Sequence, residues 1–566
     1  MAAENPGVTE GPGAAENPGA AVNPGAAVNP GVTVNPGVTV NPGVTENPGV
    51  TENPGVTEDP GVTEDPGAAV NPESEQPAIR SAIVVGAGTS GAIVARRLSD
   101  AGVAVTLIEA GGYDTNPAIH DPSRAGELWH SAEDWDFFTV PQPHAGGRRL
   151  HLPRGKVTGG SHALNAMIWV RGAASDYDRW DREGATGWSW ADVEPVFAAI
   201  ENDLLPVTDD YPLSPIQASI IEAAVQEGLP HNPNYNGGVL DGVSQEQVTM
   251  RDGRRVNTWT AYAQPIAEQL TILTGREVHS VIVHDGRAVG VRLGEGEETE
   301  EVRADEVILA AGAIGTPVIL LRSGIGPADE LDALGIPVVL DAPGVGRNLH
   351  DHLLSPVIFA TGKKPVGPPQ PGVSVTQSHL FWRSREGLPE PDTQPIHFSV
   401  PMWGELEPRG SDGFTLMAGL VTPYSRGSLR LTGPGLADPP AIDLAALEDQ
   451  RDADALAASV RQCRRIGTRP ALAEEWGATE VYPGPDVPDD AVEDWVRRTA
   501  ITYHHQVGTC RMGSDAEAVV DPQLRVRGID GLRVVDASVM PTVPTGNTNA
   551  PAAMIGERGA RFVLAG

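Results

Sequence analysis

Two adjacent histidines near the C-terminus have the side chains best suited to acid–base chemistry. They are His504 and His505, in the segment ITYHHQVGTCRMG (501–513). Neutral imidazole is the usual acceptor of a proton near neutral pH. Neighbouring side chains of an extended segment point to opposite faces, so we expect only one of the two to face a given site. Considered alone, the pair is compatible with a catalytic base and equally with two buried polar residues.

A glycine-rich segment close to the start of the apolar sequence predicts a nucleotide site. Residues 82–112 read AIVVGAGTSGAIVARRLSDAGVAVTLIEAGG, which predicts a strand, a turn, an amphipathic helix and a second strand. Gly86 permits the turn, Gly88 lets backbone N–H groups approach a pyrophosphate, and Gly91 lets helix and strand pack closely. Glu109 ends the second strand, where an acid binds a ribose hydroxyl. We therefore predict a dinucleotide-binding Rossmann unit; the alternative is a purely structural one.

The composition excludes several classes of function. The chain has 566 residues and a formal charge of −35, which disfavours nucleic acid and anionic membranes as partners. No apolar run approaches the roughly 18 residues of a membrane span, and the N-terminal residues do not resemble a secretory signal. The two cysteines, Cys463 and Cys510, suggest neither a disulfide framework nor a metal site, and the adjacent histidines lack further ligands. We expect a cytoplasmic protein without a metal centre, and Cys510 as buried packing.

Residues 1–79 form a low-complexity tail. Hexapeptide units such as NPGVTV, NPGVTE and DPGVTE recur from Asn5 to Asn71. A period of six residues can indicate a parallel β-helix, but here valine and alanine are the only apolar side chains. Proline in each unit also removes a backbone donor. We predict a disordered, solvated spacer, because this composition buries too little to offset the entropy of ordering.

Four further segments decide which kind of dinucleotide protein this is. They are LPRGKVTGGSHALNAMIWVRGAASDYDRW (152–180), AAGAIGTPVILLRSGIGP (310–327), PGVGRNLHDH (343–352) and DASVMPTVPTGNTNAPAAMIGERGA (536–560). With these segments the chain resembles the glucose–methanol–choline (GMC) flavoprotein oxidoreductases from about Ala82 to about Phe562. Residues 312–326 match the second signature of that family without departure. The first signature, at 155–172, departs at Thr158, where an aliphatic residue is usual, and at His162, where a small hydroxyl residue is usual.

The resemblance implies an α/β (α+β) fold of two domains. A Rossmann-like FAD-binding domain would be accompanied by a substrate domain built on an antiparallel sheet. Residues 80–350 would form mainly the FAD-binding domain, with part of the substrate domain at about 176–240. Residues 351–500 would form mainly the substrate domain. Residues 501–566 would return to the FAD-binding domain and carry the catalytic residues.

The resemblance also implies the cofactor and its contacts. Some members attach FAD covalently through a histidine at the position that matches Leu164; leucine cannot form that bond, so we expect non-covalent FAD, with His162 as the nearest alternative. The cofactor-binding residues carried over are Gly86, Gly88, Thr89, Ser90, Gly91, Glu109, Gly155, Gly159, Gly160, Ser161, Asn165, Ala166, Met167, Val278, Asp536, Ala537, Asn547 and Thr548. Asn549 is a further candidate for a flavin contact.

The family's catalytic pattern separates the two histidines. Its base histidine stands three residues before the glycine of a V-G-T segment; Gly508 is that glycine, which makes His505 the base and places His504 on the opposite face. Gln506 replaces a common proline. The second catalytic position, a His or Asn in the family, matches Asn547, which would hold the substrate oxygen. Apart from the resemblance, Asn547 could be a turn residue, because Gly-Asn readily forms turns.

These inferences together predict an alcohol oxidoreductase. FAD would take a hydride at N5 from a primary or secondary alcohol, or a hydrated aldehyde, while His505 takes the hydroxyl proton. Oxygen or another acceptor would reoxidise the flavin; the oligomeric state stays open. Two alternatives are a GMC-type hydroxynitrile lyase with non-redox FAD and a nicotinamide-dependent dehydrogenase. For the substrate pocket the candidates are Phe381, Trp382, Met402 and Trp403, although core packing explains them equally well.

Overall fold

The computed structural model describes residues 79–296, 299–403 and 412–566. The chain divides by its contacts into Met1–Glu73 and Ser74–Gly566, and every described residue belongs to the second unit. The tail predicted at 1–79 falls almost wholly outside the described residues. Within the described residues, no helix is both long and apolar enough to cross a membrane.

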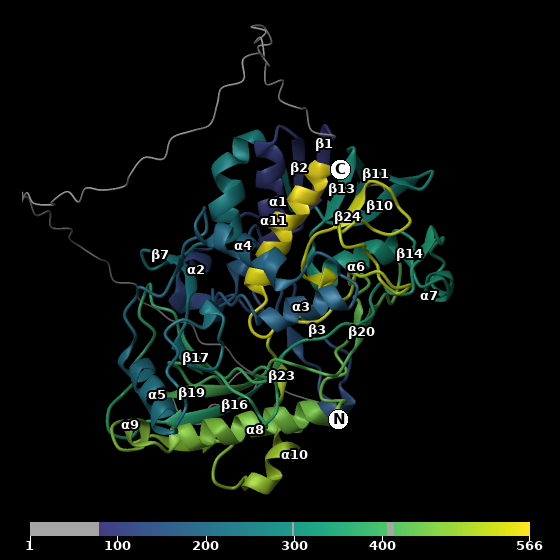
Figure 1. Cartoon of the computed structure of the whole chain (residues 1–566). Helices are drawn as coiled ribbons and strands as arrows, with labels where there is room; N and C mark the ends of the chain where they lie inside the picture. The colour runs from purple at the N-terminus through teal and green to yellow at the C-terminus, as the bar shows by residue number, and fades with distance from the viewer. Residues whose placement is uncertain (1–78, 297–298, 404–411) are drawn as a thin grey trace, which may run out of the picture. The chain divides into compact units, whose positions relative to one another are not determined.

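A parallel sheet carries the predicted nucleotide motif (Figure 1). Its strands, in spatial order, are β24 (Leu532–Val534), β13 (Glu306–Leu309), β1 (Ser81–Val85), β2 (Ala104–Glu109) and β9 (Thr271–Thr274). Their residues are mostly apolar and buried, as is typical of parallel strands that are covered on both faces. Helix α1 (Thr89–Asp100) connects β1 to β2, so the strand–turn–helix–strand prediction is confirmed.

Helices pack closely around this sheet. Helix α11 (Asn549–Ala565) lies along α1, and α6 (Gly312–Arg322) follows β13 (Figure 1). The two paired helices approach closely because glycine stands at the contact: a Cβ atom on Gly556 would lie 3.0 Å from Cα of Ser90. A three-stranded antiparallel sheet of β10 (Val278–His284), β11 (Arg287–Leu293) and β12 (Glu300–Arg303) lies beside the parallel sheet.

A larger antiparallel sheet forms the second half of the molecule, as predicted. Among the described residues its path runs β22 (Thr479–Tyr482), β16 (Leu353–Ala360), β19 (Gly413–Leu420), β18 (Ile396–Phe398), β17 (Thr376–Phe381) and β6 (Gly242–Gln245), with β23 (Ile501–Thr502) also paired to β16. Helices α8 (Gln450–Gly467) and α5 (Pro215–Gln226) cover it (Figure 1). Strand β6 begins just beyond the predicted insertion at 176–240, and β23 leads directly into the two histidines.

The remaining helices and strands have at most 12 residues each. The other α-helices of the described residues are α2 (Pro117–His120), α3 (Ala174–Arg182), α4 (Trp190–Glu201), α7 (Ala328–Ala333), α9 (Pro470–Ala473) and α10 (Val492–Thr499). The other strands there are β3 (Phe137–Phe138), β4 (His151–Leu152), β5 (Val207–Thr208), β7 (Val248–Arg251), β8 (Arg254–Arg255), β14 (Ile325–Gly326), β15 (Leu340–Asp341), β20 (Ser428–Arg430) and β21 (Ala441–Asp443).

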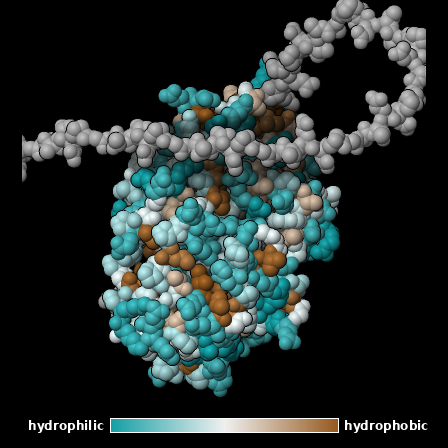
Figure 2. Space-filling model, turned by 60° about the vertical axis from the view of Figure 1, so that its left-hand side comes forward, coloured by the Kyte–Doolittle hydropathy of each residue, from teal (hydrophilic) through white to brown (hydrophobic). Residues whose placement is uncertain are grey.

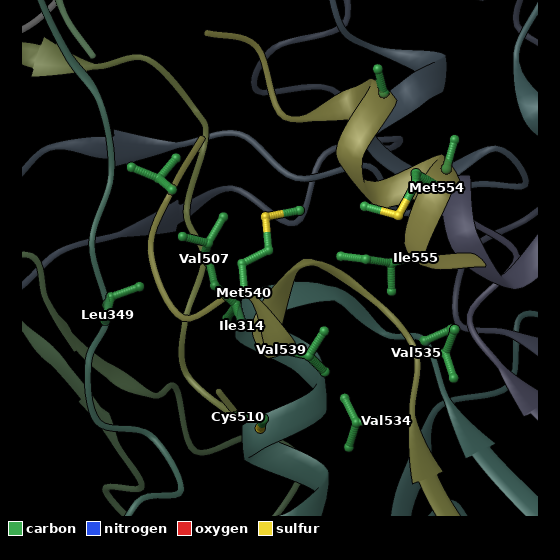
Figure 3. Close-up of a cluster of buried hydrophobic side chains, with 14 of the residues drawn as sticks. Ile314, Leu349, Val507, Cys510, Val534, Val535, Val539, Met540, Met554 and Ile555 are labelled. Atoms are coloured by element: carbon green, nitrogen blue, oxygen red, sulfur yellow. The ribbon is translucent and has the colours of Figure 1, made fainter. Parts of the chain in front are cut away.

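A continuous apolar core joins the segment after the histidines to the parallel sheet. In Figure 3, Val507 and Cys510 lie among side chains from α6, β24 and α11, including Ile314, Val534 and Ile555. Cys510 is fully buried, and burial raises the pKa of its thiol well above the ordinary value. It is therefore a packing residue, as predicted. On the face of the molecule in Figure 2, hydrophobic patches interrupt a mainly hydrophilic surface.

Candidate active site

Two glycine-rich turns meet at the N-terminus of α1. Gly86 has φ +103°, and a Cβ atom there would lie 2.4 Å from the carbonyl oxygen of Ala310. Gly160 has φ +53°, and its Cβ would lie 2.8 Å from Cα of Gly88. No side chain caps the first turn of α1. Free backbone N–H groups at a helix N-terminus, with no side chain in the way, form a site for a pyrophosphate.

A cavity of about 1410 Å³ extends from these turns to the antiparallel sheet. It is larger than the ~300–1,000 Å³ of an ordinary small-molecule site. All of the predicted cofactor residues line it except Gly91 and Gly159, and both predicted catalytic residues line it as well. Of the four predicted pocket residues, Met402 and Trp403 line the cavity, whereas Phe381 and Trp382 do not.

Gly91 and Gly159 do not line the cavity but contact the glycine turns that do. A Cβ atom on Gly91 would lie 1.9 Å from the carbonyl oxygen of Gly86, so this glycine lets the helix follow the strand closely. Gly159 has φ +96°, and its N–H donates to the carbonyl of Ala87 at 2.8 Å. Gly159 therefore connects the second turn to the first.

Glu109 and Asp536 hold the backbone at two points of the cavity wall. The Glu109 carboxylate accepts N–H groups of Ala87 and Gly111, both at 2.9 Å. Burial raises its pKa to about 7. The Asp536 carboxylate accepts the N–H of Gly312 at 2.9 Å and the hydroxyl of Thr316 at 2.6 Å. Each carboxylate is thus held rigidly where the resemblance places a cofactor contact.

His162 is fully buried at the cavity wall, although a small hydroxyl residue is usual at its position. Its Nε2 lies 2.9 Å from Oγ1 of Thr249 and 3.1 Å from Nδ2 of Asn549. Burial lowers its pKa to about 3, so the ring is neutral. Thr158, the other departure, accepts the N–H of Asp114 at 3.0 Å and does not line the cavity.

The backbone at the two histidines is not extended throughout, so that part of the sequence prediction was wrong. Strand β23 ends at Thr502, and His504 has φ +67°, in the left-handed region. This kink breaks the alternation of side chains. As a result His504 and His505 both line the cavity, rather than lying on opposite faces. What distinguishes them is the set of groups that each ring contacts.

His505 contacts the second predicted catalytic residue. Its Nε2 lies 3.3 Å from Nδ2 of Asn547, and its Nδ1 lies 3.0 Å from Nδ1 of His352. Tyr503 stacks on the ring at a centroid distance of 4.5 Å. Burial lowers the pKa of His505 well below the ordinary value, and the nearby His352, His504 and Arg154 lower it further. The imidazole is therefore neutral and able to accept a proton.

The amide of Asn547 is oriented by a residue that the sequence did not indicate. Gln394 donates from Nε2 to Oδ1 of Asn547 at 2.9 Å. The same nitrogen lies 3.1 Å from Nδ1 of His379. Because Oδ1 of Asn547 accepts from Gln394, its NH₂ group faces His505. The amide can therefore donate hydrogen bonds toward the base and toward a bound oxygen.

A buried carboxylate supports the backbone of His505. Asp351 accepts the N–H of His505 at 2.7 Å and Nε2 of Gln506 at 2.5 Å. Burial raises the pKa of Asp351 to about 7, whereas these hydrogen bonds and the charge of Arg154 lower it. Gln506, where a proline is common, thus adds a hydrogen bond to the support of the base.

His504 makes a different set of contacts. Its Nδ1 lies 2.6 Å from Oγ1 of Thr502, and its ring meets the edge of Trp129 at 5.1 Å. Its carbonyl oxygen accepts a hydrogen bond from Arg154 at 2.5 Å. Burial lowers the pKa of this ring as well. These contacts are those of a packed residue at the cavity wall.

Another histidine cluster lies on the cavity wall, outside the base region. His130, Asp136 and His151 bring potential metal-ligand atoms within 4.8 Å of one another. The two imidazole rings stack at a centroid distance of 3.9 Å and an angle of 22°. Stacked rings hold their in-plane lone pairs nearly parallel, whereas ligands of one ion must converge on it. Nδ1 of His130 lies 2.6 Å from the Asp136 carboxylate, so hydrogen bonding explains this cluster.

Comparison with known proteins agrees with the geometry. Family models described as GMC oxidoreductase match residues 80–354 and 423–556. The chain belongs to the GMC oxidoreductase family. It is 36% identical to an alcohol dehydrogenase [acceptor] of Pseudomonas putida, with 85% of this chain and 95% of the relative aligned. It is 34% identical to an oxygen-dependent choline dehydrogenase of Photobacterium profundum, over 85% of this chain and 92% of the relative.

A solved structure shares the fold of this GMC oxidoreductase. Pyridoxine 4-oxidase from Mesorbium loti superimposes with a TM-score of 0.80 at 36% identity, covering 85% of this chain and 98% of that one. The protein is an FAD-dependent oxidoreductase that acts on CH–OH donors. The site fits FAD, because the paired glycine turns leave a cradle that side chains would fill. Leu164, where some members carry a histidine that binds FAD covalently, lines the cavity.

Proposed function

We propose that His505 is the base that accepts the hydroxyl proton of an alcohol, and that Asn547 holds the alcohol oxygen. The observation that carries the proposal is the contact between Nε2 of His505 and the Asn547 amide, 3.3 Å apart on the wall of one cavity. An alcohol oxygen in the cavity within hydrogen-bond reach of both groups would meet an acceptor for its proton and a donor for its lone pair. His504 has no such partner on that wall.

The hydrogen-bond network favours the form of His505 in which Nε2 carries no proton. Nδ1 of His505 and Nδ1 of His352 are close enough that one must donate to the other. Burial lowers the pKa of His352 to about 3, so its ring is neutral and carries one proton. The arrangement in which His505 donates from Nδ1 and His352 accepts leaves Nε2 of His505 without a proton. The Asn547 NH₂ group, turned toward Nε2 by Gln394, requires the same arrangement.

The cofactor would be held by the glycine turns, by Glu109 and by the wall around Asp536. When bound, FAD supplies the acceptor for the hydride that leaves the alcohol carbon. Reoxidation needs oxygen or another acceptor; the names of the relatives include both an oxygen-dependent enzyme and one defined only by an acceptor. The chain's own task is therefore to bind the alcohol, orient it and remove its proton.

Paired substitutions test the assignment. Replacing His505 with alanine should slow anaerobic flavin reduction by an alcohol by about 10²–10⁴-fold, the usual contribution of a general base. The variant should retain FAD, because His505 is not part of the glycine turns. Replacing His504 with alanine is the matched control and should have a much smaller effect. Normal reduction in the His505→Ala protein, with loss in His504→Ala, would reverse the roles.

A further inference from the structure

The part of the cavity next to the base has an apolar wall. Six apolar side chains that belong to one buried cluster or pack against it line this part of the cavity: Ile168, Leu354, Ile396, Phe398, Met402 and Met417. They pack with Tyr503, whose ring stacks on His505, so this wall and the base belong to one chamber. A substrate whose hydroxyl reaches His505 must place its remaining atoms against these side chains.

The carboxylates that line the cavity lie outside the apolar wall. Among the described residues that line it, Glu109 and Asp536 hold the backbone of the nucleotide side. Glu277 and Asp438 lie beside the C-terminal end of α6, where Arg322 lies 3.8 Å from Glu277 and donates to the carbonyl of Gly435. None of these four acidic residues belongs to the apolar wall.

The fifth carboxylate of the described lining is already paired. One carboxylate oxygen of Asp136 lies 2.6 Å from Nδ1 of His130 and 3.1 Å from Nε2 of His151. The charged groups near His505 are Arg154, which lines the cavity, and Asp351, which does not and already accepts the N–H of His505 and the amide of Gln506. Arg154 lines the cavity, contacts the carbonyl of His504 and lowers the pKa of His505 through its charge. A cation bound at His505 would therefore lose its hydration and meet an apolar wall and the charge of Arg154, because Asp351 does not line the cavity and already accepts two hydrogen bonds.

Aromatic rings can also bind a cation, but the ring that stacks on His505 has one face covered. Cation–π binding needs a free ring face over which the cation can lie. One face of Tyr503 is covered by the imidazole of His505. Burial raises the pKa of the Tyr503 hydroxyl well above its ordinary value, so this group stays neutral and adds no negative charge.

We propose that this enzyme oxidises uncharged alcohols with an apolar carbon skeleton and discriminates against alcohols that carry a quaternary ammonium group. The inference rests on the proposed function, because it takes His505 as the point to which the hydroxyl is bound. It separates this chain by substrate class from the choline dehydrogenases to which it is similar. The physical reason is that moving a charge from water to an apolar wall is unfavourable unless an opposite charge meets it.

Two alcohols of the same shape test the proposal. Choline and 3,3-dimethylbutan-1-ol differ by a positive nitrogen in place of a carbon, and both offer a primary hydroxyl. With the purified FAD-loaded enzyme, kcat/KM for 3,3-dimethylbutan-1-ol should exceed that for choline by about 10²-fold or more. Each tenfold ratio corresponds to a difference of ~1.4 kcal/mol in transition-state free energy. Equal values, or a preference for choline, would overturn the proposal and mean that a carboxylate reaches the chamber from elsewhere in the chain.

A charge placed on the wall gives a second, matched measurement. Met417 is buried on β19 and lines the cavity, and Met417→Gln and Met417→Glu have nearly the same shape as methionine. The glutamate variant should reduce the preference for the uncharged alcohol at least tenfold relative to the glutamine variant. Identical ratios in the two variants would count against the proposal. If neither variant folds, the comparison of choline with 3,3-dimethylbutan-1-ol in the wild-type enzyme still tests the proposal.

The two proposals fail in different ways. Benzyl alcohol serves as an uncharged reference substrate. If choline reduces the flavin as readily as the uncharged alcohols and His505→Ala abolishes the reaction, the base assignment stands and the inference on substrate class is wrong. If the uncharged alcohols react readily and His505→Ala does not slow them, the base assignment fails. A flavin that none of the alcohols reduces would overturn both.

Discussion

The Nδ1 atoms of His505 and His352 lie 3.0 Å apart, and both rings are buried. A hydrogen bond between two neutral imidazoles requires one nitrogen to donate and the other to accept, and the Asn547 NH₂ group at Nε2 of His505 favours His505 as the donor. Here it leaves Nε2 of His505 facing the Asn547 amide. His352 does not line the cavity, so under the proposed function we expect it to act as a positioning residue, through His505.

His352 should be replaceable by a hydrogen-bond acceptor but not by a hydrocarbon. We expect His352→Leu to slow flavin reduction about 10–100-fold. This is the rate loss that corresponds to the free energy of one hydrogen bond to a charged group, because the bond stabilises His505 as the ring becomes positive. His352→Asn, which can still accept from Nδ1 of His505, should recover part of the rate. The measurement is anaerobic stopped-flow reduction across pH. Equal rates and pH profiles in the two variants would show a role in packing alone.

Asn547 should act as a hydrogen-bond donor. Alanine at this position removes the amide next to Nε2 of His505, and we expect flavin reduction to slow by about 10–100-fold. Asn547→His keeps a donor and should retain more activity than Asn547→Ala. Gln394→Leu should give a smaller loss in the same direction, since Gln394 only orients the amide. An alanine variant with the wild-type rate constant would remove Asn547 from the mechanism.

The sequence contained the signals for the fold and for most of the cofactor site. The spacing of Gly86, Gly88 and Gly91 predicts the strand–turn–helix unit, because a strand, a turn and a helix are local structures. The count back from Gly508 likewise selected His505, which lines the cavity beside Asn547. Such features could be predicted because they depend on residues that are close in the chain.

The rest of the site depends on contacts between distant segments. His352 stands 153 positions from His505 and Gln394 stands 153 positions from Asn547, so only the folded antiparallel sheet brings each pair together. The segment PGVGRNLHDH, which ends at His352, was the one signal for the first pair. The left-handed backbone of His504 was not predictable either, because nothing in its side chain requires φ of +67°.

The pH dependence of flavin reduction should show that the base has a low pKa. His505 accepts a proton only when neutral, so activity falls as the pH drops through its pKa. Burial and nearby positive charge lower that pKa, and the acid limb should therefore lie below pH 6.5, the value of an unperturbed histidine. Rates of anaerobic reduction between pH 4 and pH 8 would locate it. An acid limb above pH 6.5 would contradict the neutral, buried base.

Arg154 offers a direct test of that electrostatic argument. Its positive charge lowers the pKa of His505, so Arg154→Gln should move the acid limb to higher pH. Arg154→Lys keeps the charge and is the matched control, with an acid limb expected near that of the wild type. If both variants shift equally, the hydrogen bond from the guanidinium to the His504 carbonyl, rather than the charge, would be responsible.

FAD should be released when the protein is denatured. Leu164 has no nucleophilic atom, and the nitrogens of His162 are engaged: Nε2 lies near Thr249 and Asn549, and Nδ1 accepts the N–H of Thr258 at 3.4 Å. A neutral imidazole with both nitrogens in hydrogen bonds is poorly placed to attack the flavin. After acid precipitation the yellow colour should therefore stay in the supernatant. Colour in the pellet that disappears in His162→Ala would instead identify His162 as the point of attachment.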